Sequence, residues 1–285
     1  MRLAAKRRAR WSISNLPDAG EHQSILMNGG VVEVVRLGRG DPIVLVPGLA
    51  GGWKLLVPLA RRLAQRHEVI LYSLRGDRGA LVDSRARNLG DYAGDLARLI
   101  ELLRLERPTV FGVSFGGAVA LEMAVERPER IGALVLQGVE SRFRVTIGSA
   151  IAKTVLERFP LPSDNPFVNQ FFNLLFGGKP EPGPLVDFVV EHCWETDQSM
   201  MSQRLQMLEE FDVSDRLWRI DMPSLILAGT RDVIVPPHRQ RALADHIPGS
   251  RFVSLEGAGH VGFLTHRTDV AQHVGQLLRS RLSLC

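Results

Sequence analysis

The segment Gly112-Val113-Ser114-Phe115-Gly116 places a serine between two glycines, where a strand pattern changes into a helix pattern. The β-branched and aromatic run 109–111 precedes this segment, and the helix-favouring run 118–124 follows it. Small flanking residues allow a turn tight enough to project a hydroxyl from the end of a sheet. A serine in this context is typical of a nucleophile elbow, so Ser114 is the candidate nucleophile.

A serine hydroxyl is a weak nucleophile at neutral pH and needs a base, which a carboxylate usually orients. Among the eight histidines, His260 stands out because it ends the flexible loop Gly257-Ala258-Gly259 that follows a predicted strand. Asp232 is the candidate carboxylate, since it follows another predicted strand almost directly. Open α/β sheets bind ligands at the carboxyl ends of their strands, where all three side chains are expected.

Four other acidic residues follow a predicted strand or lie beside or inside the helix after one. Glu140 comes just after the predicted strand 131–136, and it is the reserve acid for orienting the base. Asp77, Asp91 and Asp95 lie beside or within the helical segment that follows an earlier strand. We predict that these three are helix caps or solvated charges.

The elements that must position these side chains follow from the hydrophobic pattern. Short apolar runs predict strands at 23–27, 31–37, 43–46, 69–72, 109–111, 131–136, 224–227 and 251–255. Asn28-Gly29-Gly30 between the first two runs predicts a hairpin. Amphipathic or helix-favouring segments at 54–65, 92–105, 118–124, 238–246 and 268–281 alternate with the later strands. Such alternation predicts an α/β fold with a doubly wound, mostly parallel sheet.

This alternation stops between residues 138 and 213, where no strand pattern is evident. Prolines interrupt the segment, its apolar residues take helical spacing, and eight of the twelve phenylalanines fall within it. We therefore predict a helical cap at 138–213, inserted into a core formed by 21–137 and 214–285. Some of its aromatic rings would form the cap's own core, and the others would face a substrate.

Composition excludes several classes of function. The formal net charge is +4, and five of the basic residues fall in the first ten positions, so residues 1–20 are predicted to be a disordered basic tail. The near-neutral remainder argues against nucleic-acid binding. The chain has no apolar run of about 18 residues, so no membrane-spanning segment is expected. Two cysteines without metal or redox spacing favour a reducing, cytoplasmic location.

From about residue 23 onward, the chain resembles the α/β-hydrolase fold superfamily, especially its cap-bearing, esterase-like members. The matching segments are Pro47-Gly48-Leu49-Ala50-Gly51, Arg75-Gly76, the elbow around Ser114, Gly229 to Asp232, and Gly259-His260. The resemblance implies an eight-stranded, mostly parallel sheet with the active site under the cap. It also implies that the backbone N–H groups of Leu49 and Phe115 bind the oxyanion. The chain departs from many relatives in having Pro47-Gly48 in place of His-Gly and Ser73 in place of Asp.

These features predict a serine hydrolase that uses Ser114, His260 and Asp232 on a small or medium, largely apolar ester. The same triad could instead cleave a carbon–carbon bond or let peroxide replace water. A ligand-binding or signalling protein with little turnover is the alternative from another class. No cofactor or metal is expected, because the chain contains no H-E-x-x-H, paired C-x-x-C or G-x-x-x-x-G-K-[ST] motif.

Overall fold

The computed structural model describes residues 20–27, 30–78, 80, 88–143, 151, 153–156 and 166–282. Within these residues one sheet has the strand order β1-β2-β4-β3-β5-β6-β7-β8. Its strands are β1 (Glu21–Met27), β2 (Gly30–Leu37), β3 (Pro42–Val46), β4 (Glu68–Tyr72), β5 (Thr109–Val113), β6 (Ala133–Gln137), β7 (Ser224–Gly229) and β8 (Arg251–Leu255). The predicted basic tail, apart from Gly20, and the Asn28-Gly29 turn lie outside the described residues.

The pairing of the strands is antiparallel at one edge and parallel over the rest of the sheet. β1 pairs with β2, and β2 with β4, in antiparallel register. From β4 through β3, β5, β6 and β7 to β8 every pairing is parallel. This arrangement confirms the predicted eight-stranded, mostly parallel sheet, and it brings the carboxyl ends of β3, β5, β6, β7 and β8 to one edge.

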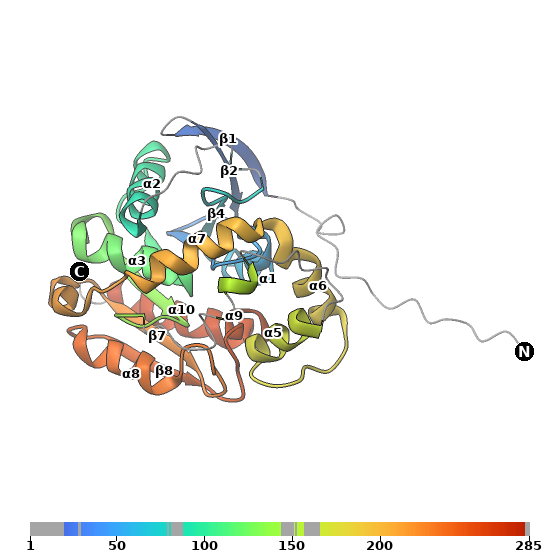
Figure 1. Cartoon of the computed structure of the whole chain (residues 1–285). Coiled ribbons are helices and arrows are strands. Elements are labelled where there is room, and N and C mark those ends of the chain that lie inside the picture. Colours follow the sequence, from blue (N-terminus) through green and yellow to red (C-terminus); the bar gives the residue numbers. More distant parts are fainter. Residues whose placement is uncertain are drawn as a thin grey trace, which may run out of the picture.

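Helices cover both faces of the sheet, which explains why its central strands are continuous apolar runs. In β3, Val44 and Val46 pack into the cluster that includes α2 (Leu89–Leu102) and α3 (Phe115–Glu126). Ile43 and Leu45 point to the opposite face and pack with α1 (Val57–Leu63) and α10 (Arg267–Leu282). Figure 1 shows α2 and α3 next to each other on the first face.

The helix predicted at 54–65 differs from the observed one in its first turn. Residues Trp53–Leu56 form a 3₁₀ turn (η2), and the α-helix α1 begins at Val57. Pro58 lies in the first turn of α1, where its missing N–H costs no helical hydrogen bond. The proline therefore explains why the regular α-helix starts later than the hydrophobic pattern suggested.

The regular elements that the structure describes between β6 and β7 are all helical. They include α5 (Pro166–Phe176), α6 (Pro184–His192), η4 (Cys193–Glu195), α7 (Gln198–Glu209) and η5 (Ser214–Arg219). These elements run from yellow-green to orange in Figure 1, where α5 and α6 lie on the opposite side of the molecule from α2 and α3. α7 contacts the elbow helix α3, and α6 contacts η2, so the inserted helices pack on the loops at the strand ends.

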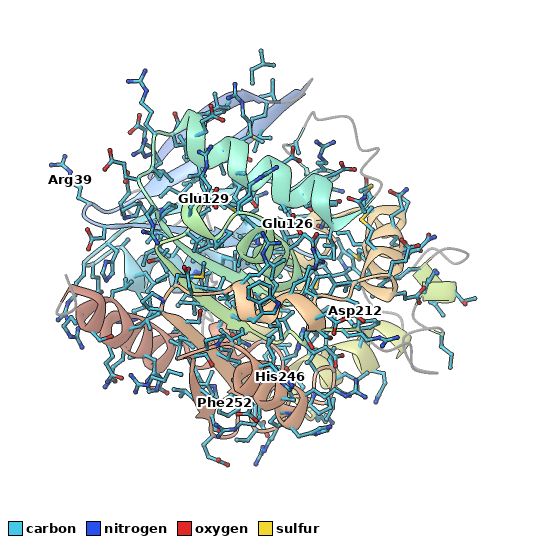
Figure 2. All side chains as sticks on the ribbon, turned by 90° about the vertical axis from the view of Figure 1, so that its left-hand side faces the viewer. Arg39, Glu126, Glu129, Asp212, His246 and Phe252 are labelled. Atoms are coloured by element: carbon cyan, nitrogen blue, oxygen red, sulfur yellow. The ribbon has the colours of Figure 1, made fainter. Side chains whose placement is uncertain are left out.

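Charged side chains surround the core, as Arg39, Glu126 and Glu129 illustrate in Figure 2, where they lie at the surface. One partly buried ring, Phe252 of β8, is covered by the guanidinium of Arg241, whose Cζ atom lies 3.8 Å from the ring centre.

None of the helices in the described ranges has both the length and the apolar character needed to cross a bilayer.

Candidate active site

Ser114 lies at a sharp turn between β5 and α3. Its backbone has φ 53° and ψ −116°, a conformation that L-residues rarely adopt. The Ser114 N–H donates to the Gln137 carbonyl of β6 over 2.9 Å, which fixes the turn to the neighbouring strand. A Cβ atom on Gly116 would lie 2.2 Å from the Val46 carbonyl oxygen. Glycine at this position therefore lets the start of α3 approach the end of β3.

The two residues predicted to form an oxyanion hole come from different segments. Phe115 follows this turn directly, and Leu49 lies in the loop after β3. Phe115 is the first residue of α3, so its N–H has no carbonyl acceptor within the helix. The positive end of the helix dipole favours a negative charge at the same place. Leu49 follows β3 and lines the same cavity as Ser114. The geometry is compatible with both donors, whose role stays a prediction.

Three side chains from three strand ends form a hydrogen-bonded chain. Ser114 Oγ lies 2.9 Å from His260 Nε2, and His260 Nδ1 lies 2.9 Å from Asp232 Oδ2. Both His260 and Asp232 are buried. An imidazole that donates from Nδ1 to Asp232 leaves Nε2 as the acceptor for the serine proton. The structure thus brings together the three residues that the sequence singled out.

Asp232 is held by more than His260. Its Oδ1 accepts from the backbone N–H groups of Ile234 at 3.0 Å and Val235 at 2.9 Å. Its Oδ2 also accepts from Nε2 of Gln240 at 3.2 Å, and Gln240 Oε1 accepts from the Gly138 N–H at 2.9 Å. Gln240 lies on α8 (Pro237–His246) and is fully buried. Sequence reasoning missed this residue because a glutamine in a predicted surface helix gives no signal of burial.

The loop that carries His260 is held from two directions. The His260 carbonyl accepts from Nε2 of Gln137 at 2.8 Å, and the Val261 N–H donates to the Leu175 carbonyl of α5 at 3.1 Å. A Cβ atom on Gly138 would lie 2.8 Å from the His260 ring, and Gly138 also has φ +68°. The imidazole therefore rests against a position where a larger residue would displace it.

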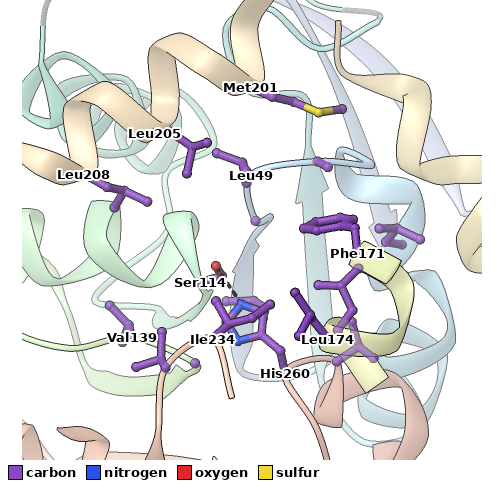
Figure 3. Close-up of a pocket in the computed structure, with 18 of the residues that line it drawn as sticks. Leu49, Ser114, Val139, Phe171, Leu174, Met201, Leu205, Leu208, Ile234 and His260 are labelled. Atoms are coloured by element: carbon purple, nitrogen blue, oxygen red, sulfur yellow. Dashed lines mark hydrogen bonds between the residues drawn. The ribbon is translucent and has the colours of Figure 1, made fainter. Parts of the chain in front are cut away.

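Above Ser114 is a cavity of about 380 Å³. Figure 3 shows Met201, Leu205 and Leu208 of α7 on one side of it and Phe171 and Leu174 of α5 on another, with Ser114 and His260 between them. Among the described phenylalanines of the predicted cap, those that line the cavity are Phe143, Phe171, Phe172 and Phe211. The Ser114 hydroxyl thus faces a surface made mostly of carbon.

Other ionisable groups lie at the cavity without joining the hydrogen-bonded chain of Ser114. The reserve acid Glu140 pairs with Arg239, whose Nη1 lies 3.3 Å from Glu140 Oε1, while Asp232 occupies the place beside His260.

Cys193 lines the cavity, but burial raises the pKa of its thiol to about 12, so the thiol stays protonated at neutral pH. Among the described residues, no group of three or more His, Cys, Asp or Glu side chains could hold a metal ion.

The prediction that Asp77 and Asp95 are caps or solvated charges is wrong. Both carboxylates are buried, and each pairs with an arginine. Asp95 bonds to Arg75, and Asp77 Oδ1 accepts from Arg204 Nη2 of α7 at 2.9 Å. A buried carboxylate needs such a partner, and Arg204 lies 127 positions away in the sequence, which is why the burial of Asp77 went unrecognised.

Comparisons with known proteins agree with the fold. RutD from Azorhizobium caulinodans, named as a candidate carbamate hydrolase, is 28% identical in an alignment 236 positions long that covers 78% of this chain and 85% of RutD. Polyketide synthase ThaQ from Burkholderia thailandensis is 29% identical in an alignment 256 positions long that covers 85% of this chain and 12% of ThaQ. The structure of the esterase EaEST from Exiguobacterium antarcticum gives a TM-score of 0.79 at 22% identity, covering 91% of this chain and 99% of EaEST.

At 22% identity, the likeness to EaEST supports the fold alone. The family model is the stronger finding, because a model described as the alpha/beta hydrolase fold matches residues 41–267. That match spans both the elbow and the loop that carries His260. The chain therefore belongs to the α/β-hydrolase fold family of hydrolases.

Proposed function

We propose that this chain is a serine hydrolase that cleaves small or medium, largely apolar carboxylic esters. The observation that carries the proposal is the continuous hydrogen-bonded chain Asp232–His260–Ser114 on the floor of an apolar cavity. Nucleophile, base and orienting carboxylate at these distances are the arrangement that acyl transfer requires.

The first half of the reaction acylates the serine. Ser114 Oγ attacks the ester carbonyl carbon while His260 Nε2 accepts the hydroxyl proton, and the carbonyl oxygen becomes an oxyanion. The N–H groups of Leu49 and Phe115 would donate to that oxyanion. Collapse of the tetrahedral intermediate breaks the bond to the alcohol oxygen, which takes the proton from His260 and leaves.

The second half releases the acid. A water molecule gives its proton to His260 Nε2 and attacks the acyl carbon, forming a second oxyanion in the same place. When this intermediate collapses, the proton returns to Ser114 Oγ and the carboxylic acid departs. Asp232 keeps its orientation throughout, because it accepts two backbone N–H bonds besides the imidazole. Its role is to hold the tautomer and stabilise the imidazolium.

The character of the cavity supports an ester with an apolar acyl or alcohol group. Besides the Cys193 thiol, which stays protonated, the ionisable side chains among the described lining residues are His260, Glu140 and Arg239. Glu140 and Arg239 neutralise each other. A small polar carbamate, the substrate class in the name of RutD, would leave most of this carbon surface unused. We further propose that residues 138–213 act as the cap that selects substrates.

Active-site labelling tests the nucleophile. A serine-directed fluorophosphonate should form a one-to-one adduct with the parent protein and none with Ser114→Ala. His260→Ala should react far more slowly, because the hydroxyl has lost its base. Ser280→Ala is the matched control, since that hydroxyl bonds within α10 at 2.7 Å and should not change labelling. An unlabelled parent protein would refute the enzyme proposal and leave a ligand-binding role.

A series of 4-nitrophenyl esters tests the substrate class. Two further buried methylene groups contribute about 1.6 kcal/mol, so kcat/KM should rise by about 15-fold from acetate to butyrate. The polar methoxyacetate ester, similar in length to butyrate, should gain much less once each kcat/KM is divided by the ester's rate of alkaline hydrolysis, because its α-oxygen activates the carbonyl. Equal corrected values for butyrate and methoxyacetate would contradict recognition by the apolar cavity.

A further inference from the structure

Arg204 is the most unusual side chain outside the catalytic group. It lies on α7 and is fully buried, although arginine is almost never found without solvent unless it is paired. Its spacing from Met201 and Leu208 puts it on the same inward face of the helix as these cavity-lining residues. A guanidinium in this place must have a full set of acceptors.

Those acceptors all come from the core, three of them from the loops after β3 and β4 and one from α2. Nη2 donates to Asp77 Oδ1 at 2.9 Å and to the Arg75 carbonyl at 2.7 Å, both in the loop after β4. Nε lies 3.4 Å from the Tyr92 hydroxyl. Nη1 donates to the Leu49 carbonyl at 3.0 Å, in the loop after β3. One side chain of the inserted segment thus ties two strand-end loops together.

Both residues predicted to bind the oxyanion touch this guanidinium. Leu49 is held through its carbonyl, and the Phe115 ring lies with its centre 5.4 Å from Arg204 Cζ. The Phe115 ring also packs edge-on against Tyr92, at 5.0 Å between ring centres. Bonding and cation–π contact at one guanidinium therefore fix the distance between the loop of Leu49 and the start of α3.

The loop after β3 needs such a tether. It reads Pro47-Gly48-Leu49-Ala50-Gly51-Gly52, and Gly51 and Gly52 have φ values of 79° and 51°. Glycine-rich segments lose much conformational freedom when they are ordered. Position 47 carries a proline, whose side chain cannot donate a hydrogen bond to brace the loop. Arg204 supplies a donor from outside the loop.

We propose that Arg204 is the positioning residue of the oxyanion hole, holding Leu49 in register with Phe115 from the inserted helix α7. This inference rests on the proposed esterase function. Because Arg204 acts through Leu49 and Phe115, its loss should lower transition-state stabilisation more than substrate binding. Misplacing one oxyanion donor typically costs on the order of 100-fold in turnover.

Two variants distinguish a role of Arg204 in positioning Leu49 from a role that only docks α7 on the core. Arg204→Lys keeps a charge beside Asp77 but cannot reach Leu49 and Arg75 with one planar fork. The double variant Arg204→Met with Asp77→Asn removes the charge without leaving a buried carboxylate unpaired. Ile220→Ala is the control for lost stability, because Ile220 is buried. It precedes the amino-terminal end of β7, whereas Ser114 follows the carboxyl end of β5.

A pair of matched ketones gives the decisive readout. An apolar trifluoromethyl ketone adds to Ser114 and places an oxyanion in the hole, whereas the matching methyl ketone occupies the cavity without adding. In Arg204→Lys, Ki for the trifluoromethyl ketone should rise at least about 10-fold, with kcat falling to a similar extent. Ki for the methyl ketone and KM should change less than about 3-fold. Ile220→Ala should keep the parent ratio of the two Ki values.

The proposal would be overturned if folded Arg204 variants kept the parent ratio of the two Ki values, whether both affinities fell equally or neither changed. A parent protein that fails to distinguish the two ketones would instead refute the function of Ser114. In that case, hydrogen exchange in the peptide covering residues 47–53 decides the structural claim. Exchange faster in Arg204→Lys than in Ile220→Ala supports the tether, and equal exchange excludes it.

Discussion

Replacing Ser114 by glycine should stabilise the fold relative to replacing it by alanine. Both substitutions remove the hydroxyl and its contact with His260 equally. They differ in the Cβ atom, which alanine keeps and glycine lacks. At φ 53° and ψ −116° this Cβ atom is the source of strain, because the conformation resembles the first central position of a type II′ turn, which glycine dominates.

The size of the difference follows from two opposing terms. A non-glycine residue in such a conformation costs about 1–3 kcal/mol, which Ser114→Gly would relieve. Glycine in turn adds freedom to the unfolded chain, which costs about 0.4–1 kcal/mol. The strain term is the larger, so Ser114→Gly should be about 1 kcal/mol more stable than Ser114→Ala.

Urea unfolding with a shared m-value measures this difference as a shift in midpoint. Ala242→Gly is the matched control, because Ala242 is exposed within α8, where glycine should cost about 1 kcal/mol. Replacing alanine by glycine should therefore raise the free energy of unfolding at position 114 and lower it at position 242. A Ser114→Gly protein less stable than Ser114→Ala by the amount seen at Ala242 would show that the elbow stores no strain.

Three other predictions follow from buried or partly buried side chains near the site. Gln240→Leu removes a donor to Asp232, so the free energy of unfolding should fall by about 3 kcal/mol. Ester turnover should fall as well, and normal turnover would show that Asp232 does not need this hydrogen bond. Leu205→Trp fills part of the cavity and should lower kcat/KM on long apolar esters at least about 10-fold more than on acetate, whereas an equal loss on both would contradict the cavity assignment. Burial lowers the pKa of His192, so its unfolded form binds a proton that the folded form does not, and stability should fall as pH drops below about 6.5. His192→Phe should flatten this decline in urea titrations at pH 7 and pH 5.5, and an equally steep decline would assign it to another group.

Much of the framework could be predicted because it depends on local pattern. Apolar runs locate the strands, and parallel strands necessarily end at one edge of the sheet. Ser114, Asp232 and His260 each follow a strand within a few residues, so their convergence needed only the topology. The 3₁₀ turn before α1 was missed, since hydrophobic spacing does not separate the two helix types over one turn.

Contacts between distant segments could not be predicted in this way. Gln240 and Arg204 lie on helices whose polar residues look like ordinary surface residues, but both are fully buried, and each bonds to a residue more than 100 positions away. Asp77 was misjudged for the same reason, because an acidic residue after a strand is most often a cap. A pairing across 127 positions leaves no periodic trace in a single sequence.

The same helix, α7, carries both kinds of contact, so under the proposals above it would connect substrate selection with catalysis. On α7, Leu205 lines the cavity, and its neighbour Arg204 holds Leu49 and Asp77. A substitution that shifts α7 to admit a larger substrate would also move the Arg204 guanidinium away from the Leu49 carbonyl. Reshaping the cavity from α7 should therefore lower kcat even for esters that still fit. Reshaping it from α5, through Phe171 or Leu174, should alter selectivity with a smaller effect on kcat, because α5 has no such contact with the loop after β3 among the hydrogen bonds of the described residues.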